Sequence, residues 1–179
     1  MTMDYKAFIF DYNAFVEELA DILENALVTN ENHKLIAFIE KNLSYLKDPD
    51  EGEPLDYSWK EMIEIGDISE YGDFAITKYY NPKCDIGIGY DWERLDDLLL
   101  KELNVDISPL LGTPFGSSGN YFDPGKQGSY FQSLEKVKNN LELLDSLSKQ
   151  KLDNLPGIAI LNKMLSDASV LEKGLYITF

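Results

Sequence analysis

Apolar residues recur at helical spacing along several stretches of the chain, and these stretches alternate with shorter runs that are typical of β-strands. Between residues 14 and 27 the apolar positions fall on one helical face and acidic side chains surround them, which predicts an amphipathic helix. After a polar break the same pattern returns over residues 31–46. Because short connections make consecutive helices neighbours, we predict an N-terminal helical hairpin over residues 11–46.

The clearest β pattern lies between residues 74 and 91. The segment FAITKYY is rich in aromatic and β-branched residues, NPKC has the composition of a tight turn, and DIGIGYD alternates large side chains with glycine. This predicts an antiparallel hairpin with its turn at residues 81–84 and with Ile86 and Ile88 buried on one face. The opposite face carries glycines, Gly87 among them, and so allows close approach to the backbone.

Three further helices and a final strand are predicted in the second half of the chain. They cover residues 92–103, 134–149 and 155–171 and, for the strand, 175–179. Ser133 is a residue type preferred at a helix N-terminus, and Gly174 is suited to end a helix. Three shorter runs fit a strand or helical turn at residues 5–10, a short helix at 58–65 and a short strand at 104–108.

Residues 110–131 interrupt this regular pattern with five glycines, two prolines and five aromatic residues. Glycine and proline exclude a long regular element, whereas a flexible linker would contain few large rings. We therefore predict an ordered loop that folds back on itself, with at least two of its rings buried in the core. The five rings are Phe115, Tyr121, Phe122, Tyr130 and Phe131.

Together these elements predict an α+β fold, in which four or five amphipathic helices pack on a small antiparallel sheet. The length of 179 residues favours one globular domain over residues 1–179. Its expected parts are the helical hairpin 11–46, the β-hairpin and helix 74–103, the Gly/aromatic loop 110–131 and the C-terminal helices 133–172.

The charge balance narrows the classes of partner. The chain has 32 acidic and 16 basic residues and a formal net charge of −16. Such a field repels nucleic acid and anionic lipid and favours a basic protein partner. The alternative is that the acidic residues only keep the protein soluble.

The single cysteine, Cys84, permits no internal disulfide and no structural zinc site of paired thiols. The first residues have no basic leader followed by a long apolar run, and no apolar run is long enough to cross a bilayer. We therefore expect a cytoplasmic protein that does not enter the membrane.

Several weak motifs fail at positions that their chemistry requires. Gly87 and Gly89 stand where a dinucleotide fingerprint would begin, but Trp92 occupies the position of its third glycine. Lys126 follows a glycine, yet Gln127 replaces the hydroxyl residue of a phosphate-binding loop. The acidic run at residues 48–53 lacks the glycine and the final glutamate of a calcium loop. We expect no cofactor and no metal.

No catalytic set emerges from the remaining candidates. His33 is the only histidine and begins a helix among polar residues, which favours a surface position. A catalytic base needs a nucleophile within reach, and the sequence neither places Cys84 or Ser117 beside His33 nor excludes it. Adjacent carboxylates such as Asp96 and Asp97 point to different faces of a helix, so they do not converge.

The general profile of a small, acidic, aromatic-rich chain with one cysteine resembles that of bacterial immunity and inhibitor proteins. This resemblance is one of composition and assigns no residues. It implies a non-enzymatic protein that neutralises or recruits a basic partner. Because aromatic side chains within polar rims dominate the binding energy of interfaces, we expect the anchors among the exposed rings of the Gly/aromatic loop. The candidate partner-binding residues are Phe115, Tyr121, Phe122 and Tyr130. The alternatives are a small-ligand-binding protein or enzyme in which residues 112–131 cover a pocket, and a domain whose loop only fills a gap.

Overall fold

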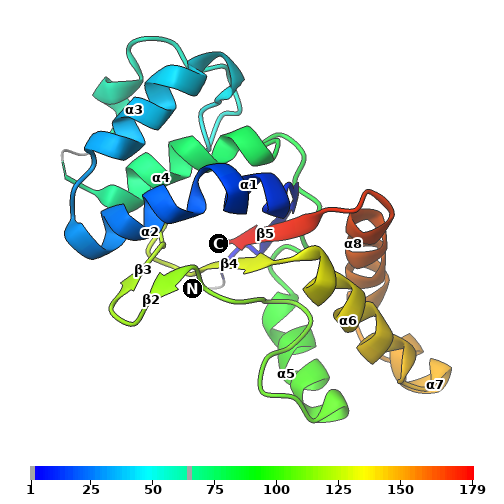
Figure 1. Cartoon of the computed structure of the whole chain (residues 1–179). Helices are drawn as coiled ribbons and strands as arrows, with labels where there is room; N and C mark the ends of the chain where they lie inside the picture. Colours follow the sequence, from blue (N-terminus) through cyan, green and yellow to red (C-terminus); the bar gives the residue numbers. More distant parts are fainter. Residues whose placement is uncertain (1–2, 64–65) are drawn as a thin grey trace.

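A three-stranded antiparallel sheet forms the centre of the computed structural model, which describes residues 3–63 and 66–179. The strand order is β1 (Lys6–Phe10), β5 (Gly174–Thr178) and β4 (Ser129–Gln132), so the C-terminal strand lies in the middle. The described part contains eight α-helices, which are arranged around this sheet (Figure 1). The fold is α+β, as predicted. Strand β5 was predicted, and β1 shows that the strand is the correct alternative for residues 5–10, but β4 lies in the predicted loop and the predicted hairpin 74–91 is not part of this sheet.

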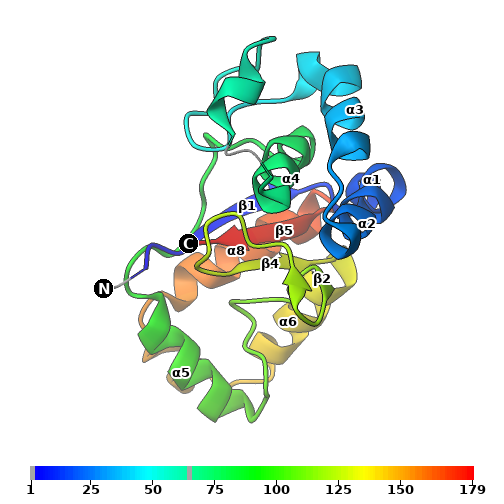
Figure 2. The same cartoon turned by 90° about the vertical axis from the view of Figure 1, so that its left-hand side faces the viewer.

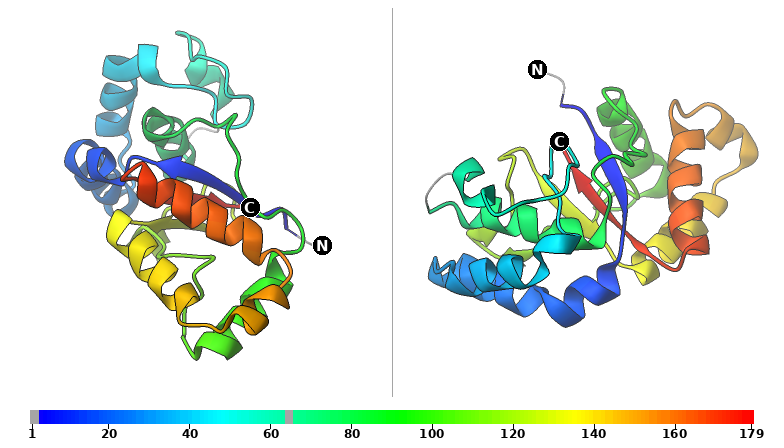
Figure 3. Two further views of the ribbon diagram at one scale, coloured as in Figure 1. Left: turned by 90° about the vertical axis from the view of Figure 1, so that its right-hand side faces the viewer. Right: turned by 90° about the horizontal axis from the view of Figure 1, so that it is seen from above.

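The two faces of the sheet carry different side chains, because successive residues of a strand point to opposite sides. One face, the aromatic face, presents Phe8, Phe10, Phe131 and Tyr176 to the helices α1–α4. The other, the aliphatic face, presents Ala7, Leu175 and Ile177 to α5, α6 and α8. Figures 2 and 3 show these two helical layers on opposite sides of the sheet.

The helices over the aromatic face are short. They are α1 (Tyr12–Glu18), α2 (Ala20–Thr29), α3 (His33–Asn42) and α4 (Ile68–Ile76). The single helix predicted over residues 14–27 is divided at Leu19, which has φ −125° and ψ −31°. The second predicted helix ends at Asn42 and continues as a 3-10 turn, Leu43–Tyr45.

The helices over the aliphatic face agree better with the sequence. They are α5 (Trp92–Leu103), α6 (Leu134–Asp145), α7 (Lys149–Asp153) and α8 (Ile158–Val170). Ser133 caps α6, since its side chain accepts a hydrogen bond from the backbone N–H of Lys136 at 3.2 Å. The short strand predicted over residues 104–108 is wrong, because Asn104 ends α5 in a left-handed conformation and no strand follows it there.

The predicted β-hairpin over residues 74–91 is also wrong. Its first half belongs to α4 and to the 3-10 turn Thr77–Tyr79. The turn at residues 81–84 is present, with the Cys84 N–H donating to the Asn81 carbonyl at 2.9 Å. Aromatic and β-branched residues suggested a strand, but here they cover several sides of a helix that is buried nearly all round, so tertiary packing overrides their preference.

The second half of that segment is extended, but it pairs with β1. The Ile86 N–H donates to the Ala7 carbonyl at 2.8 Å, and Gly89 forms a bridge to Tyr5. The close approach predicted for the glycine face is confirmed, because a Cβ added to Gly87 would lie 2.2 Å from the Tyr5 carbonyl oxygen. Ile86 and Ile88 are only partly buried, at the edge of the aliphatic core.

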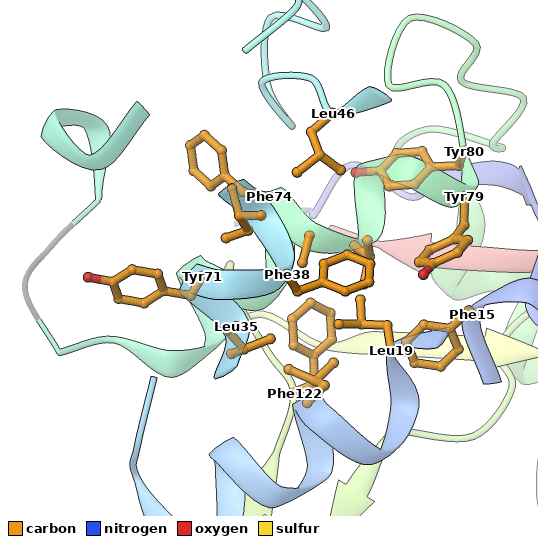
Figure 4. Packing of buried hydrophobic residues seen from close by; sticks show 14 of the residues in the cluster. Phe15, Leu19, Leu35, Phe38, Leu46, Tyr71, Phe74, Tyr79, Tyr80 and Phe122 are labelled. Carbon is orange, nitrogen blue, oxygen red and sulfur yellow. The ribbon is translucent and has the colours of Figure 1, made fainter. Parts of the chain in front are cut away.

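The Gly/aromatic loop is ordered, as predicted. It contains the small hairpin of β2 (Gly116–Ser117) and β3 (Asn120–Tyr121), and Thr113 pairs with Phe131 along the free edge of β4. Phe122 and Phe131 are 0% and 2% exposed, which confirms that at least two of the rings are buried. Figure 4 shows Phe122 among side chains of the aromatic core.

The predicted short helix at residues 58–65 is represented by a 3-10 turn, Trp59–Met62, whose indole is buried. Residues 64–65 lie outside the described residues. This turn and the preceding acidic loop close the outer edge of the aromatic layer, where the surface is hollowed.

Candidate functional site

A cleft opens where the loop of residues 47–55, helix α4 and the Gly/aromatic loop meet the sheet. It consists of two neighbouring hollows of about 300 and 340 Å³. Both hollows are lined by Pro49, Asp50, Asp73, Pro124 and Gly125. We call the combined hollow the acidic cleft. It brings together segments that are far apart in the sequence, which is why no local motif indicated it.

Asp73 lies at the floor of the acidic cleft and is presented by α4. The helix is held at its start by Asp67, whose carboxylate accepts hydrogen bonds from the N–H groups of Ser69 (2.9 Å) and Glu70 (3.4 Å). Most of the other side chains of α4 are buried in the aromatic core. Asp73 is the half-buried position of this helix that lines both hollows, so the packing of α4 directs its carboxyl group into the cleft.

The electrostatic surroundings of Asp73 are unfavourable to a negative charge. Burial raises the pKa of Asp73 to about 8, with further contributions from the nearby carboxylates of Asp50, Asp48 and Glu70. Asp73 forms no hydrogen bond or ion pair with any residue in the described ranges 3–63 and 66–179. Its carboxyl group therefore exchanges a proton near neutral pH and has no countercharge of its own.

Two tyrosines form the aromatic wall beside Asp73. The ring centroids of Tyr80 and Tyr176 are 5.2 Å apart, and both residues line the cleft. Burial, followed by the charge of Asp73, raises the pKa of each phenol well above its usual value. Both hydroxyls therefore stay protonated at neutral pH and are able to donate hydrogen bonds, whereas the rings themselves are packed in the aromatic core.

The rim of the cleft is formed by a structured acidic turn. One carboxylate oxygen of Asp48 accepts hydrogen bonds from the N–H groups of Asp50 (2.8 Å) and Glu51 (2.6 Å). The Asp48 N–H donates to the Glu53 carbonyl at 2.8 Å, which closes the turn. This fixes Asp50 at the entrance, so the acidic run at residues 48–53 shapes the rim of the cleft.

On the opposite side of the cleft, the Asp85 carboxylate forms hydrogen bonds that stabilise the fold. One carboxylate oxygen of Asp85 accepts hydrogen bonds from the N–H groups of Ala7 (3.0 Å) and Gly87 (2.8 Å). Lys6 is exposed at this side and forms no ion pair with the described residues. Asp85 thus anchors the extended segment, and Asp73 and Asp50 are the acids that remain available to a ligand.

The residues predicted to contact a partner are scattered by the fold. Tyr121 is 48% exposed, whereas Phe122 is fully buried and so belongs to the core. Phe115 packs against the aromatic core and Tyr130 against the aliphatic core, both partly buried. The loop contributes Pro124 and Gly125 to the cleft in place of its rings.

Asp73 was missed because it stands in a segment that resembled a strand. The sequence nevertheless contains a signal, since burying an aspartate within the apolar stretch ISEYGDFAI costs free energy unless a partner or a function compensates for it.

The other candidate residues from the sequence do not line the cleft. Cys84 and His33 are exposed, and neither residue lines the acidic cleft. Within residues 3–63 and 66–179, no group of three or more His, Cys, Asp or Glu side chains is placed to hold a metal ion.

Comparisons with protein-family models, with curated proteins and with solved structures gave no match for this chain. Among the described residues, no helix is both long and apolar enough to span a membrane. The function must therefore be argued from the cleft itself.

Proposed function

We propose that this protein is a non-enzymatic acidic binding protein, and that the acidic cleft receives a lysine or arginine side chain of a basic protein partner. A toxin-immunity-like inhibitor that neutralises its partner is the concrete form of this proposal. The observation that carries it is the unpaired Asp73 carboxyl group at the floor of a cleft with acids at its rim. A bound cation supplies the countercharge that this carboxyl group lacks.

The walls of the cleft also favour a cation with an apolar stem. Pro49 and Pro124 offer apolar surface to its methylene groups, while Tyr80 and Tyr176, whose rings are buried in the aromatic core, line the inner end of the cleft. The net charge of −16 adds a long-range attraction that speeds the encounter with a basic protein. The same field disfavours nucleic acid and anionic lipid surfaces.

The test is a selection of short peptides that differ at one central residue, which is lysine, arginine, glutamine or glutamate. We expect the protein to enrich the lysine and arginine peptides, and Asp73→Asn to lose this preference. Asp145→Asn is the matched control, because it makes the same Asp-to-Asn substitution at an exposed position on α6. Equal binding of the glutamine peptides, or equal loss in both variants, would contradict the proposal.

The proposal also predicts a coupling between binding and protonation. Below pH 8 the Asp73 carboxyl group is largely protonated, and a bound cation favours its ionised form, so binding releases a proton. The association constant for the selected peptide should therefore rise about tenfold per pH unit between pH 6 and 8. Calorimetric titrations in buffers of different ionisation enthalpy measure the released proton directly. A pH-independent affinity would show that Asp73 does not contact the cation.

A small cationic ligand is the second candidate. It is favoured by Pro124 and Gly125, which bring residues 112–131 over both hollows as the wall of a site of small-molecule size. Lysine amide, agmatine and spermidine titrated into the same variants separate the two candidates. Binding of a free amine as tight as that of the peptide supports the small ligand, whereas peptide binding alone supports the protein partner.

A further inference from the structure

A second hollow lies on the outer side of the helices over the aromatic face, and its charge is opposite to that of the acidic cleft. It is a groove of about 620 Å³, lined by residues of α1, α2 and α3 and by Lys78. The α3 wall presents Lys34, Ala37, Phe38 and Lys41, whose spacing places them on one helical face. We call this hollow the lysine groove.

Lys78 is held in place on the opposite wall of the groove. Its ammonium group forms an ion pair with the Glu18 carboxylate and lies 5.5 Å from the centroid of the Phe38 ring. The Tyr79 hydroxyl donates a second hydrogen bond to the same Glu18 oxygen, at 3.1 Å. The hydrogen bond from Lys78 holds the pKa of Glu18 below its usual value, so this pair stays ionised and fixes Lys78 over the groove.

The other two lysines have no such partner. Lys34 and Lys41 line the groove, are exposed and form no ion pair with the described residues. The groove therefore carries three ammonium groups against the single carboxylate of Glu18, in a chain whose acids outnumber its bases by 32 to 16. The rest of the lining consists of the apolar side chains of Ile22, Ala37 and the mostly buried Phe38, together with Asn42.

We propose that the lysine groove binds a small organic anion, a carboxylate with an aromatic or branched aliphatic body. Charge complementarity identifies the carboxylate, for which Lys34 and Lys41 are the unpaired donors. The side chains of Ile22 and Ala37, beside the mostly buried Phe38, receive the apolar body. The volume of about 620 Å³ matches a small molecule rather than a single side chain. The site is separate from the acidic cleft, with which it shares no lining residue.

The experiment compares three probes with the same aromatic body: 1-naphthoate, 1-naphthylmethylamine and naphthalene-1-methanol. Calorimetric titration of the full chain should show naphthoate as the tightest of the three. Added salt should weaken naphthoate binding and leave the alcohol unchanged, because salt screens charges at an open surface. In addition, naphthoate should shift the backbone NMR signals of Ala37 and Phe38.

The variant that tests the groove is the double charge reversal Lys34→Glu/Lys41→Glu. Its matched control is Lys138→Glu/Lys149→Glu, which changes the net charge equally at exposed lysines of α6 and α7. We expect the dissociation constant of naphthoate to rise about tenfold or more in the first variant, and by about twofold or less in the control. Equal weakening in both variants, or naphthylmethylamine binding as tightly as naphthoate, overturns the proposal. Neither result bears on peptide binding in the acidic cleft.

Discussion

The two faces of the sheet are covered by cores of different chemistry. On the aromatic face, rings from β1, β4, β5 and α1 pack against one another, and the rings of α3 and α4 belong to the same core. On the aliphatic face, leucine, isoleucine, valine and alanine dominate, and Tyr5 and Trp92 are the aromatic residues among those buried there. The aromatic face has short helices, whereas the aliphatic face has the longer α5, α6 and α8.

This difference explains why the acidic cleft and the lysine groove both lie on the aromatic side. Tyrosines bring hydroxyl groups to the edge of a core, and these groups need polar partners or solvent. Tyr79 reaches Glu18 beside the lysine groove, and Tyr80 and Tyr176 line the acidic cleft. The aliphatic side also has a hollow, of about 280 Å³, which is lined by residues of α5, α6 and α7 and of the segment between α6 and α7. No tyrosine is among its lining residues, so the link between tyrosines and hollows holds for the aromatic side alone.

The largest expected effect comes from Phe131→Ala, which tests whether the rings are the main source of stability. The Phe131 ring lies 5.0 Å from Tyr176, 5.3 Å from Phe10 and 5.5 Å from Phe15, measured between ring centroids. Its removal should lower the free energy of unfolding by about 4 kcal/mol. Leu165→Ala on the aliphatic face should cost about 3 kcal/mol, measured by chemical denaturation. The reverse order would show that the aliphatic core is the stronger of the two.

A polar network at the end of β4 sharpens the comparison. The Gln132 amide N–H groups donate to the carbonyls of Pro109 (2.9 Å) and Leu111 (2.7 Å), and its oxygen accepts from Asn140 (2.9 Å). Gln132→Leu should therefore cost about 3 kcal/mol, since it leaves buried carbonyls unpaired. Asn140→Leu should cost only about 1 kcal/mol, because the Asn140 side-chain oxygen already lacks a partner among the described residues. Denaturation of both variants measures the difference, and equal losses would mean that the network acts only as a space filler.

Asp73 gives a pH-dependent effect of intermediate size. Its folded-state pKa of about 8 lies above the model-peptide value of 3.8, so between these pH values the folded state holds a proton that the unfolded state has lost. The contribution of Asp73 to stability is therefore fully present below pH 4 and is lost as pH rises towards 8. The Asp73→Asn variant does not lose this stability. At pH 8 we therefore expect its free energy of unfolding to exceed that of the unmodified protein by on the order of 2 kcal/mol.

The measurement is the melting temperature of both proteins from pH 4 to pH 9. The two curves should converge at the acidic end and separate towards the alkaline end. A parallel decline in both proteins would assign the effect to the net charge of the chain. A gain in stability together with lost peptide binding would identify Asp73 as a residue kept for binding at the expense of stability.

The hydrophobic periodicity of the sequence predicted the helices and the last strand on the aliphatic side well. Helices α5 and α8 and strand β5 lie close to their predicted positions, because one apolar stripe per helix faces one core. It failed at α4, which contacts neighbours on several sides and therefore shows no stripe. The break at Leu19 likewise leaves the apolar spacing of residues 14–27 intact, so it has no periodic signal.

The acidic cleft could not be predicted from local sequence patterns, because its residues come from distant segments. Asp50, Asp73 and Tyr176 meet only because the sheet places the C-terminal strand between β1 and β4. The sequence predicted that the loop of residues 110–131 is ordered and that some of its rings are buried, but not which rings. A Cβ at Gly72 would lie 2.8 Å from the Phe122 ring, so the burial of Phe122 relies on a glycine in a distant helix.

The smallest expected effect is that of Tyr121→Ala, and it separates the two roles of the Gly/aromatic loop. The Tyr121 ring is 48% exposed at the end of the small hairpin, so its removal should change the free energy of unfolding by less than about 0.5 kcal/mol.

We propose that this ring is an additional anchor for a partner that reaches beyond the acidic cleft. Tyr121→Ala should then weaken binding of long selected peptides and leave short ones unaffected, because short peptides fill only the cleft. Calorimetric titration of both peptide lengths measures this. An unchanged affinity for the long peptides would confine the partner to the cleft, and a stability loss like that of Phe131→Ala would mean that the hairpin belongs to the aromatic core.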